Sequence, residues 1–79
     1  MLEIKEAKYV NDFKIQLRFS NGEARLVDLS DSLKGKVFEP LRDKNYFQKF
    51  HIQFNTIEWE NGADFAPEYL FEISTLVKE

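Results

Sequence analysis

The stretch FKIQLRFSNGEARLVDL, residues 13–29, decides the fold. Apolar and polar residues alternate from Phe13 to Phe19, which is the pattern of a strand with one buried face. Asn21 and Gly22 follow. An Asn-Gly pair between alternating segments is the strongest short-range sign of a β-hairpin, because both residues tolerate positive φ angles. With a two-residue loop, apolar residues meet on one face. The predicted cross-strand pairs are then Phe19 with Ala24, Arg18 with Arg25, and Leu17 with Leu26.

The outer face of this hairpin is the one candidate basic patch of the sequence. We expect Lys14, Arg18 and Arg25 to share it. Such a row can contact phosphate groups or an acidic partner. More often it is a solvated sheet face whose charges discourage pairing at the sheet edge. The hairpin lacks the exposed aromatic residues typical of an RNA-binding sheet.

The residues before the hairpin predict a third strand. Alternation over residues 2–10 slips between Ile4 and Ala7, which indicates a β-bulge. A loop of residues 10–12 would place Tyr9 opposite Phe13. The first three strands then form an antiparallel meander.

Three later segments predict short helices that pack on the sheet. Ser30 can cap a single helical turn that Gly35 ends. Aromatic residues at helical spacing over residues 38–50, interrupted by a proline, predict two short helices or one broken helix, with Asp43 capping the second piece. Pro67 begins the last helix, because its missing N–H is harmless in a first turn. The apolar stripe of this helix comprises Tyr69, Leu70, Ile73, Leu76 and Val77.

Residues 51–65 predict a short hairpin. A strand is expected between residues 51 and 60, and Asn61-Gly62 repeats the turn signal of the first hairpin. A two-residue loop here makes Trp59 and Asp64 neighbours on one face. The predicted fold is therefore α+β: a three-stranded N-terminal meander, this second hairpin, and short helices packed on an antiparallel sheet. The 79 residues form a single domain, residues 1–79.

Composition narrows the class of protein. The chain has no cysteine, which excludes disulfides and thiolate chemistry. No apolar run is long enough to span a membrane, and charges interrupt the N-terminus where a signal peptide is apolar. We expect a cytoplasmic protein without a membrane partner. The net charge is −3. Nucleic-acid binders usually carry a basic surplus, so the overall charge argues against nucleic acid as the partner.

The segment EWENGAD, residues 58–64, is the strongest candidate site. In the functional interpretation, its turn presents Trp59, Asn61 and Asp64 to a ligand. In the structural interpretation, Trp59 packs inward and Asp64 accepts hydrogen bonds from backbone amides at the start of the last helix. The structural interpretation is favoured, because each residue type has a turn-forming reason of its own. Tyr69, on the last helix, is a further candidate interaction residue.

The sequence offers no catalytic set. Asp28 and Asp64 are the only carboxylates considered as an acid–base pair, and nothing in the sequence brings them together. His51 is the sole histidine, without a nucleophile elbow, a cysteine or metal-ligand spacing. The three glycines are isolated, so no phosphate-binding loop exists. We therefore predict no enzymatic activity, no metal and no cofactor.

Three blocks of the sequence, in this order, resemble one family. They are FSNGEARLVDLSDSL, VFEPLRDKNYFQKF and IEWENGADFAPEYLFE, and the resemblance extends from about Val10 to Glu72. The family consists of short bacterial proteins catalogued as domain of unknown function 2442. Glu60 stands where many relatives have proline, and Lys36 where many have a second glycine.

The resemblance implies an α+β domain of about this length and carries over no catalytic residue. Some relatives bear a helix-turn-helix after this domain, which we expect to be absent from this chain. Many relatives are thought to be encoded beside other small proteins. That setting implies a regulatory or toxin–antitoxin-like context.

Two classes of function remain. The first is a protein-interaction or regulatory module, antitoxin-like in its narrowest form, whose partner is another protein or a second copy of the chain. Small size, aromatic richness and an acidic C-terminal portion favour it. The second is a nucleic-acid-associated regulator that uses the Lys14, Arg18 and Arg25 face.

Overall fold

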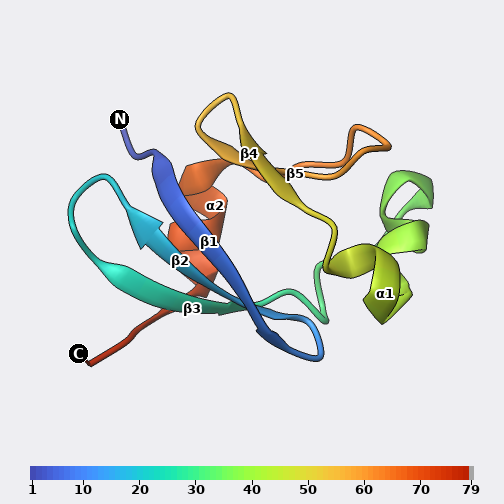
Figure 1. Ribbon diagram of the computed structural model, residues 1–79, viewed down its shortest axis with the longest axis horizontal. Helices are drawn as coiled ribbons and strands as arrows, with labels where there is room; N and C mark the ends of the chain where they lie inside the picture. The colour runs from blue at the N-terminus through green and yellow to red at the C-terminus, as the bar shows by residue number, and fades with distance from the viewer. Residues whose placement is uncertain (79) are drawn as a thin grey trace.

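Two antiparallel sheets and three short helices make up the α+β fold in the computed structural model, which describes residues 1–78 (Figure 1). The first sheet has the strand order β1-β2-β3-β6, and the second pairs β4 with β5. The strands are β1 (Ile4–Asn11), β2 (Lys14–Phe19), β3 (Ala24–Asp28), β4 (His51–Gln53), β5 (Thr56–Glu58) and β6 (Thr75–Leu76). The helices are the 3₁₀ helix η1 (Lys36–Arg42), α1 (Lys44–Phe47) and α2 (Pro67–Ile73).

The N-terminal meander β1-β2-β3 is confirmed, as is a register shift between Ile4 and Glu6, where the bulge was predicted. The predicted pairing across the first turn is wrong by two residues, since Tyr9 lies opposite Ile15. The turn is tighter than expected because Asp12 adopts a φ of 46°. A shift of two residues leaves every side chain on its predicted face.

The β2–β3 turn contains three loop residues rather than two. The N–H of Phe19 donates to the carbonyl of Glu23, and the N–H of Gly22 donates back to the carbonyl of Phe19, each across 2.9 Å. Only Gly22 takes a positive φ, of 89°. This is a type I turn followed by a glycine bulge. The predicted register is therefore wrong by one residue. Leu17 lies opposite Arg25, and Arg18 lies opposite Ala24.

The second Asn-Gly turn repeats the first. The N–H of Trp59 donates to the carbonyl of Ala63, and the N–H of Gly62 donates to the carbonyl of Trp59, again at 2.9 Å. Gly62 has the same φ of 89°. The bridge across this turn joins Glu58 to Asp64. The predicted pairing of Trp59 with Asp64 is thus wrong, and by the same single residue.

Residues 36–47 form two short helices, as predicted for residues 38–50, but the second helix ends at Phe47 rather than at Phe50. The carboxylate of Asp43 accepts a hydrogen bond from the N–H of Asn45 at 3.0 Å and so caps α1. The helical turn predicted at Ser30 is absent. Instead, the Asp28 carboxylate accepts from the N–H of Ser30, and the chain turns there without a helix. Gly35, expected to end that turn, instead precedes η1 with a φ of 95°.

Helix α2 begins at Pro67, as predicted, but it ends at Ile73, before Leu76. Leu76 belongs to β6, which pairs with β3 and adds a fourth strand to the sheet. The N–H and the side-chain hydroxyl of Ser74 both donate to the carbonyl of Phe71, which closes the helix. The helical stripe predicted through residue 77 is therefore cut short.

Helix α2 covers one face of the four-stranded sheet (Figure 1), where the ring of Phe71 meets that of Phe19 edge to face at 5.2 Å. We call this the inner face; it also carries Ile15 and Leu17, both fully buried. Aromatic rings from α1 and the second hairpin complete the core. Among residues 1–78, no helix combines the length and apolar character required to span a membrane.

Candidate functional site

Trp59, the centre of the candidate EWENGAD site, is 1% exposed. Its indole N–H donates to the carbonyl of Phe47 at 2.8 Å. Its ring lies 5.6 Å from the ring of Phe47, 6.1 Å from that of Phe50 and 6.0 Å from that of Phe65. A side chain enclosed in this way cannot present its ring to a ligand. The structural interpretation of Trp59 agrees with its burial.

Asn61 holds the same turn against the two helices η1 and α1. Its side-chain oxygen accepts from the N–H of Ala63 at 3.1 Å, and its side-chain nitrogen donates to the carbonyl of Val37 at 2.8 Å. The backbone N–H of Asn61 donates to the hydroxyl of Tyr46 at 3.1 Å. Its polar groups are therefore engaged within the fold.

Asp64 lies opposite Glu58. Because successive side chains of a strand point to opposite faces, Glu58 and Asp64 share one face of this hairpin and Trp59 lies on the other. Among residues 1–78, no hydrogen bond joins the Asp64 carboxylate to the first turn of α2, contrary to our expectation. His51, on β4, lies opposite Glu58, on β5. The Nε2 atom of His51 is 3.4 Å from the Glu58 carboxylate and 3.1 Å from the Gln53 side-chain oxygen. Across the described part of the chain, no group of His, Cys, Asp or Glu residues has the arrangement of a metal site.

Tyr69 joins α2 to the segment after β3. Its hydroxyl lies 2.7 Å from the hydroxyl of Ser32, and its ring stacks on Phe65 at 5.8 Å. The side chain remains partly exposed. Tyr69 thus has a structural role on one side and an accessible edge on the other.

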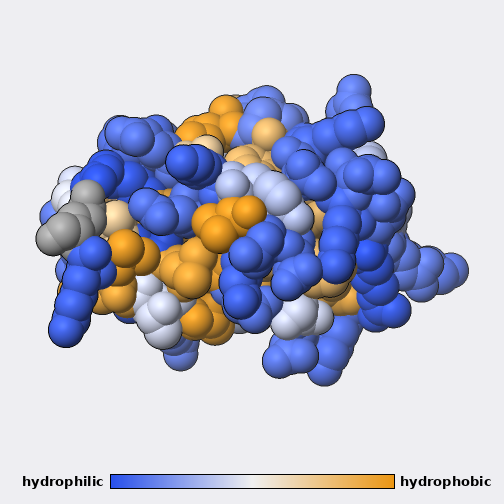
Figure 2. All heavy atoms as spheres, turned by 60° about the horizontal axis from the view of Figure 1, so that its bottom comes forward, coloured by the Kyte–Doolittle hydropathy of each residue, from blue (hydrophilic) through white to orange (hydrophobic). Residues whose placement is uncertain are grey.

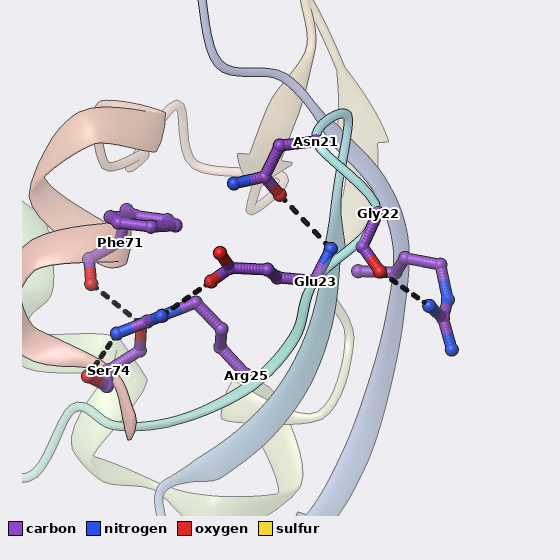
Figure 3. Close-up of polar contacts among 7 residues, drawn as sticks. Asn21, Gly22, Glu23, Arg25, Phe71 and Ser74 are labelled. Atoms are coloured by element: carbon purple, nitrogen blue, oxygen red, sulfur yellow. Dashed lines mark hydrogen bonds and ion pairs between the residues drawn. The ribbon is translucent and has the colours of Figure 1, made fainter. Parts of the chain in front are cut away.

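Arg25 does not lie on the outer face, where it was predicted. Because the loop is one residue longer, Arg25 pairs with Leu17 and points to the inner face. There its guanidinium donates to the Ser74 hydroxyl at 2.7 Å, the Ser74 carbonyl at 3.0 Å and the Glu23 carboxylate at 2.6 Å (Figure 3). It also lies 4.1 Å from the centre of the Phe71 ring. These contacts fasten the end of α2 to β3.

Lys14 and Arg18 remain on the outer face, each opposite an acidic residue. Glu6 lies across from Arg18, and Asp28 lies across from Lys14. The pKa of Asp28 is lowered, chiefly by the hydrogen bond from the Ser30 N–H and to a smaller degree by the charge of Lys14. Opposite charges on facing strands offset one another. Of the predicted row of Lys14, Arg18 and Arg25, the outer face therefore keeps two cations, and each of them faces an acid.

The outer face carries a shallow hollow of about 130 Å³ between β1, β2 and β3. Ligand pockets generally measure about 300–1,000 Å³ and enclose most of their ligand. This hollow is too small and too open for that role. Its lining residues are Glu6, Ala7, Lys8, Gln16, Leu17, Arg18 and Ala24.

The tip of the β4–β5 hairpin, at Phe54 and Asn55, is not predicted from the sequence. Phe54 and Asn55 adopt φ angles of 53° and 68°, which is a two-residue turn with both central residues left-handed. Phe54 is 83% exposed. The carbonyl of Asn55 accepts from the N–H of Ile4 at 2.8 Å, which fixes the tip beside β1. The signal was the run QFNT, in which a phenylalanine occupies a position that usually holds asparagine or glycine.

The geometry defines a small α+β domain. Three of its candidate site residues, Trp59, Asn61 and Arg25, make hydrogen bonds that hold the fold together. The family model described as "Protein of unknown function (DUF2442)" matches residues 4–75, so the chain belongs to this family. The resemblance noted from the sequence is thereby confirmed. No curated protein and no solved structure gives a significant match to the chain.

Proposed function

We propose that this chain is a protein-interaction module whose contact with its partner is centred on Phe54. The observation that carries the proposal is the exposure of Phe54 together with its backbone conformation. This large aromatic residue is 83% exposed, and its backbone is left-handed. Of the eight phenylalanines in the sequence, all within residues 1–78, Phe54 is the only one that is exposed.

Two physical arguments support this interpretation of Phe54. A bulky residue at positive φ is strained, by roughly 1–3 kcal/mol, and such strain clusters at functional sites. Exposed aromatic rings lose little conformational entropy when they enter a partner's pocket, and aromatic residues are enriched among interface anchors. Ile52, on the adjoining strand, is 42% exposed and extends the apolar surface.

The charge of the C-terminal part of the chain indicates the partner's chemistry. Residues 58–79 hold six Asp and Glu residues against one Lys. An acidic surface of this kind favours and accelerates association with a basic partner.

A regulatory or antitoxin-like role is the narrower form of the proposal, and it rests on the family resemblance alone. A binding role rather than a catalytic one is favoured because Trp59, Asn61 and Arg25 are engaged in holding the fold together. A cytoplasmic location is part of the proposal and is consistent with the absence of cysteine.

The test is site-specific photo-crosslinking in lysate of the source cells. A benzophenone side chain replaces Phe54 in one variant and Val37, also exposed but on η1, in the control. We expect one protein adduct with the Phe54 variant that survives nuclease and is absent from the control. No adduct, or equal adducts at both positions, would overturn the proposal. Loss of the adduct on nuclease treatment would favour the nucleic-acid alternative.

A further inference from the structure

The two edges of the four-stranded sheet differ in how they are protected. Strand β1, at one edge, carries Lys5, Glu6 and Lys8, and the β4–β5 turn covers its start. At the other edge, β6 and its neighbours Ser74 and Val77 contain no charge and no proline. Natural sheets guard solvent-exposed edges with charges, prolines, bulges or very short strands, and β6, with two residues, has only the last of these. An edge protected by its shortness alone remains open to pairing with another chain.

The hydrogen-bonding groups of the β6 edge point outward at Leu76. The N–H of Val77 donates to the carbonyl of Ala24 at 2.9 Å, so Val77 faces β3. Successive residues of a strand direct these groups to opposite sides, so the N–H and C=O of Leu76 point away from the sheet. Leu76 is 59% exposed, and Ile73, the last residue of α2, is 37% exposed.

Figure 2 shows the same region from the surface. Turning the lower edge of Figure 1 toward the viewer brings forward the part of the molecule where β3 and β6 lie. Hydrophobic side chains gather on this face, with hydrophilic residues around them. An apolar cluster with a polar rim is the composition of a protein–protein contact.

We infer that β6 pairs with β6 of a second copy of this chain, antiparallel, about a two-fold axis at Leu76. Leu76 then lies opposite Leu76 of the second copy, and Thr75 lies opposite Val77. The leucine pair and the two Ile73 side chains cover one another. The two sheets join into one, and the β6 edge disappears.

Charge complementarity at the rim favours a second copy over an unrelated strand. In this register Lys78 of the second copy lies opposite Ser74, on the face that carries α2. The exposed Glu72 lies two residues before Ser74, at the end of α2. An acid and a base therefore meet on each side of the axis. This contact uses no part of the Phe54 tip and is independent of the function proposed above.

The test is the molar mass of the purified full chain by light scattering, from micromolar to millimolar concentration. We expect the mass to rise from 9.4 kDa toward twice that value. Leu76→Lys should hold the mass at the monomer value, because it places two lysines at the axis. Phe54→Lys is the matched control, an apolar-to-lysine change at the other exposed site, and should dimerise like the parent chain.

A charge exchange separates this contact from a general loss of folding. Glu72→Lys should weaken the dimer by bringing it against Lys78 of the second copy, and adding Lys78→Glu should restore it. A parent chain that stays monomeric at millimolar concentration would overturn the inference. So would a Leu76→Lys variant that dimerises normally, or a double variant no better than Glu72→Lys. Circular dichroism confirms that each variant is folded.

Discussion

The indole N–H of Trp59 donates to the backbone carbonyl of Phe47 across 2.8 Å, in surroundings where both groups are buried. This one bond joins the second Asn-Gly hairpin to the end of α1. Together with the Asp43 cap and the burial of Phe47, it holds in place a helix of four residues that is too short to be stable alone. The motif that most resembled a binding site is therefore a junction of the fold.

Replacing Trp59 by Phe should destabilise the protein by about 1–3 kcal/mol or more, because the buried carbonyl of Phe47 loses its donor and the smaller ring leaves a cavity in the core. Urea unfolding monitored by circular dichroism measures the loss. Tyr46→Phe is the control, since it removes a hydrogen bond to the exposed Asn61 N–H that water can replace. Equal losses in the two variants would show that the buried bond has no special weight.

Gly22→Ala and Gly62→Ala should each lower the free energy of unfolding by roughly 1–2 kcal/mol, because an L side chain is strained at a φ of 89°. No neighbouring atom lies within 4 Å of an added Cβ, so the effect is one of backbone conformation alone. Asparagine, which tolerates left-handed φ, should cost less at both sites. Thermal melts that do not separate alanine from asparagine would contradict this reading of the turns.

Phe54→Asn should raise stability by about 1 kcal/mol while removing the proposed contact with the partner. Asparagine relieves the left-handed strain, whereas Phe54→Ala removes the ring and keeps a Cβ in the strained conformation. Comparing the melting temperatures of the two variants isolates the strain. If Phe54→Asn were less stable than the parent chain, the ring would be contributing to the fold and the proposed function would lose its support.

Asp28 should make stability depend on pH in the acid range. Its folded pKa lies below the ordinary value of 3.8, so the unfolded chain binds more protons between the two values. The contribution is fully present above about pH 4 and is lost as pH falls through the folded pKa. Asp28→Asn retains an oxygen that can accept from Ser30 and does not titrate. The stability advantage of the parent chain over this variant should shrink as pH falls from 5 to 2, and a constant difference would refute the linkage.

Both hairpins were located from the sequence, and both registers were missed for one reason. An Asn-Gly pair fits a two-residue loop and also a three-residue loop that ends in a glycine bulge. The choice between the two loop lengths depends on Asn21 and Asn61. Neither residue adopts a positive φ, and the side-chain oxygen of each accepts a hydrogen bond from the N–H two residues later. A shift of one residue reverses the face of every side chain, so the two-residue loop predicts Arg25 on the solvent side, whereas the three-residue loop places it on the inner face.

The end of α2 was missed for a different reason. Leu70, Ile73 and Leu76 fit a helical period, and local spacing alone gives no cause to stop at Ile73. The helix ends where Ser74 meets Arg25, forty-nine residues earlier in the chain. The spacing of apolar residues within a helix cannot predict a contact between residues so far apart in the sequence. The exposure of Phe54 and its φ angle are properties of the folded hairpin, so they could not be predicted from the sequence.

Trp59 is the only tryptophan in the sequence, and its ring lies 1% exposed among aromatic residues from three segments of the chain. The protein therefore carries a single tryptophan fluorophore at the place where these segments meet, and its emission can be excited separately from that of the three tyrosines. A red shift of its emission would report the loosening of any of them, with no label added. Stopped-flow fluorescence of the unmodified chain would follow the folding reaction through that one residue.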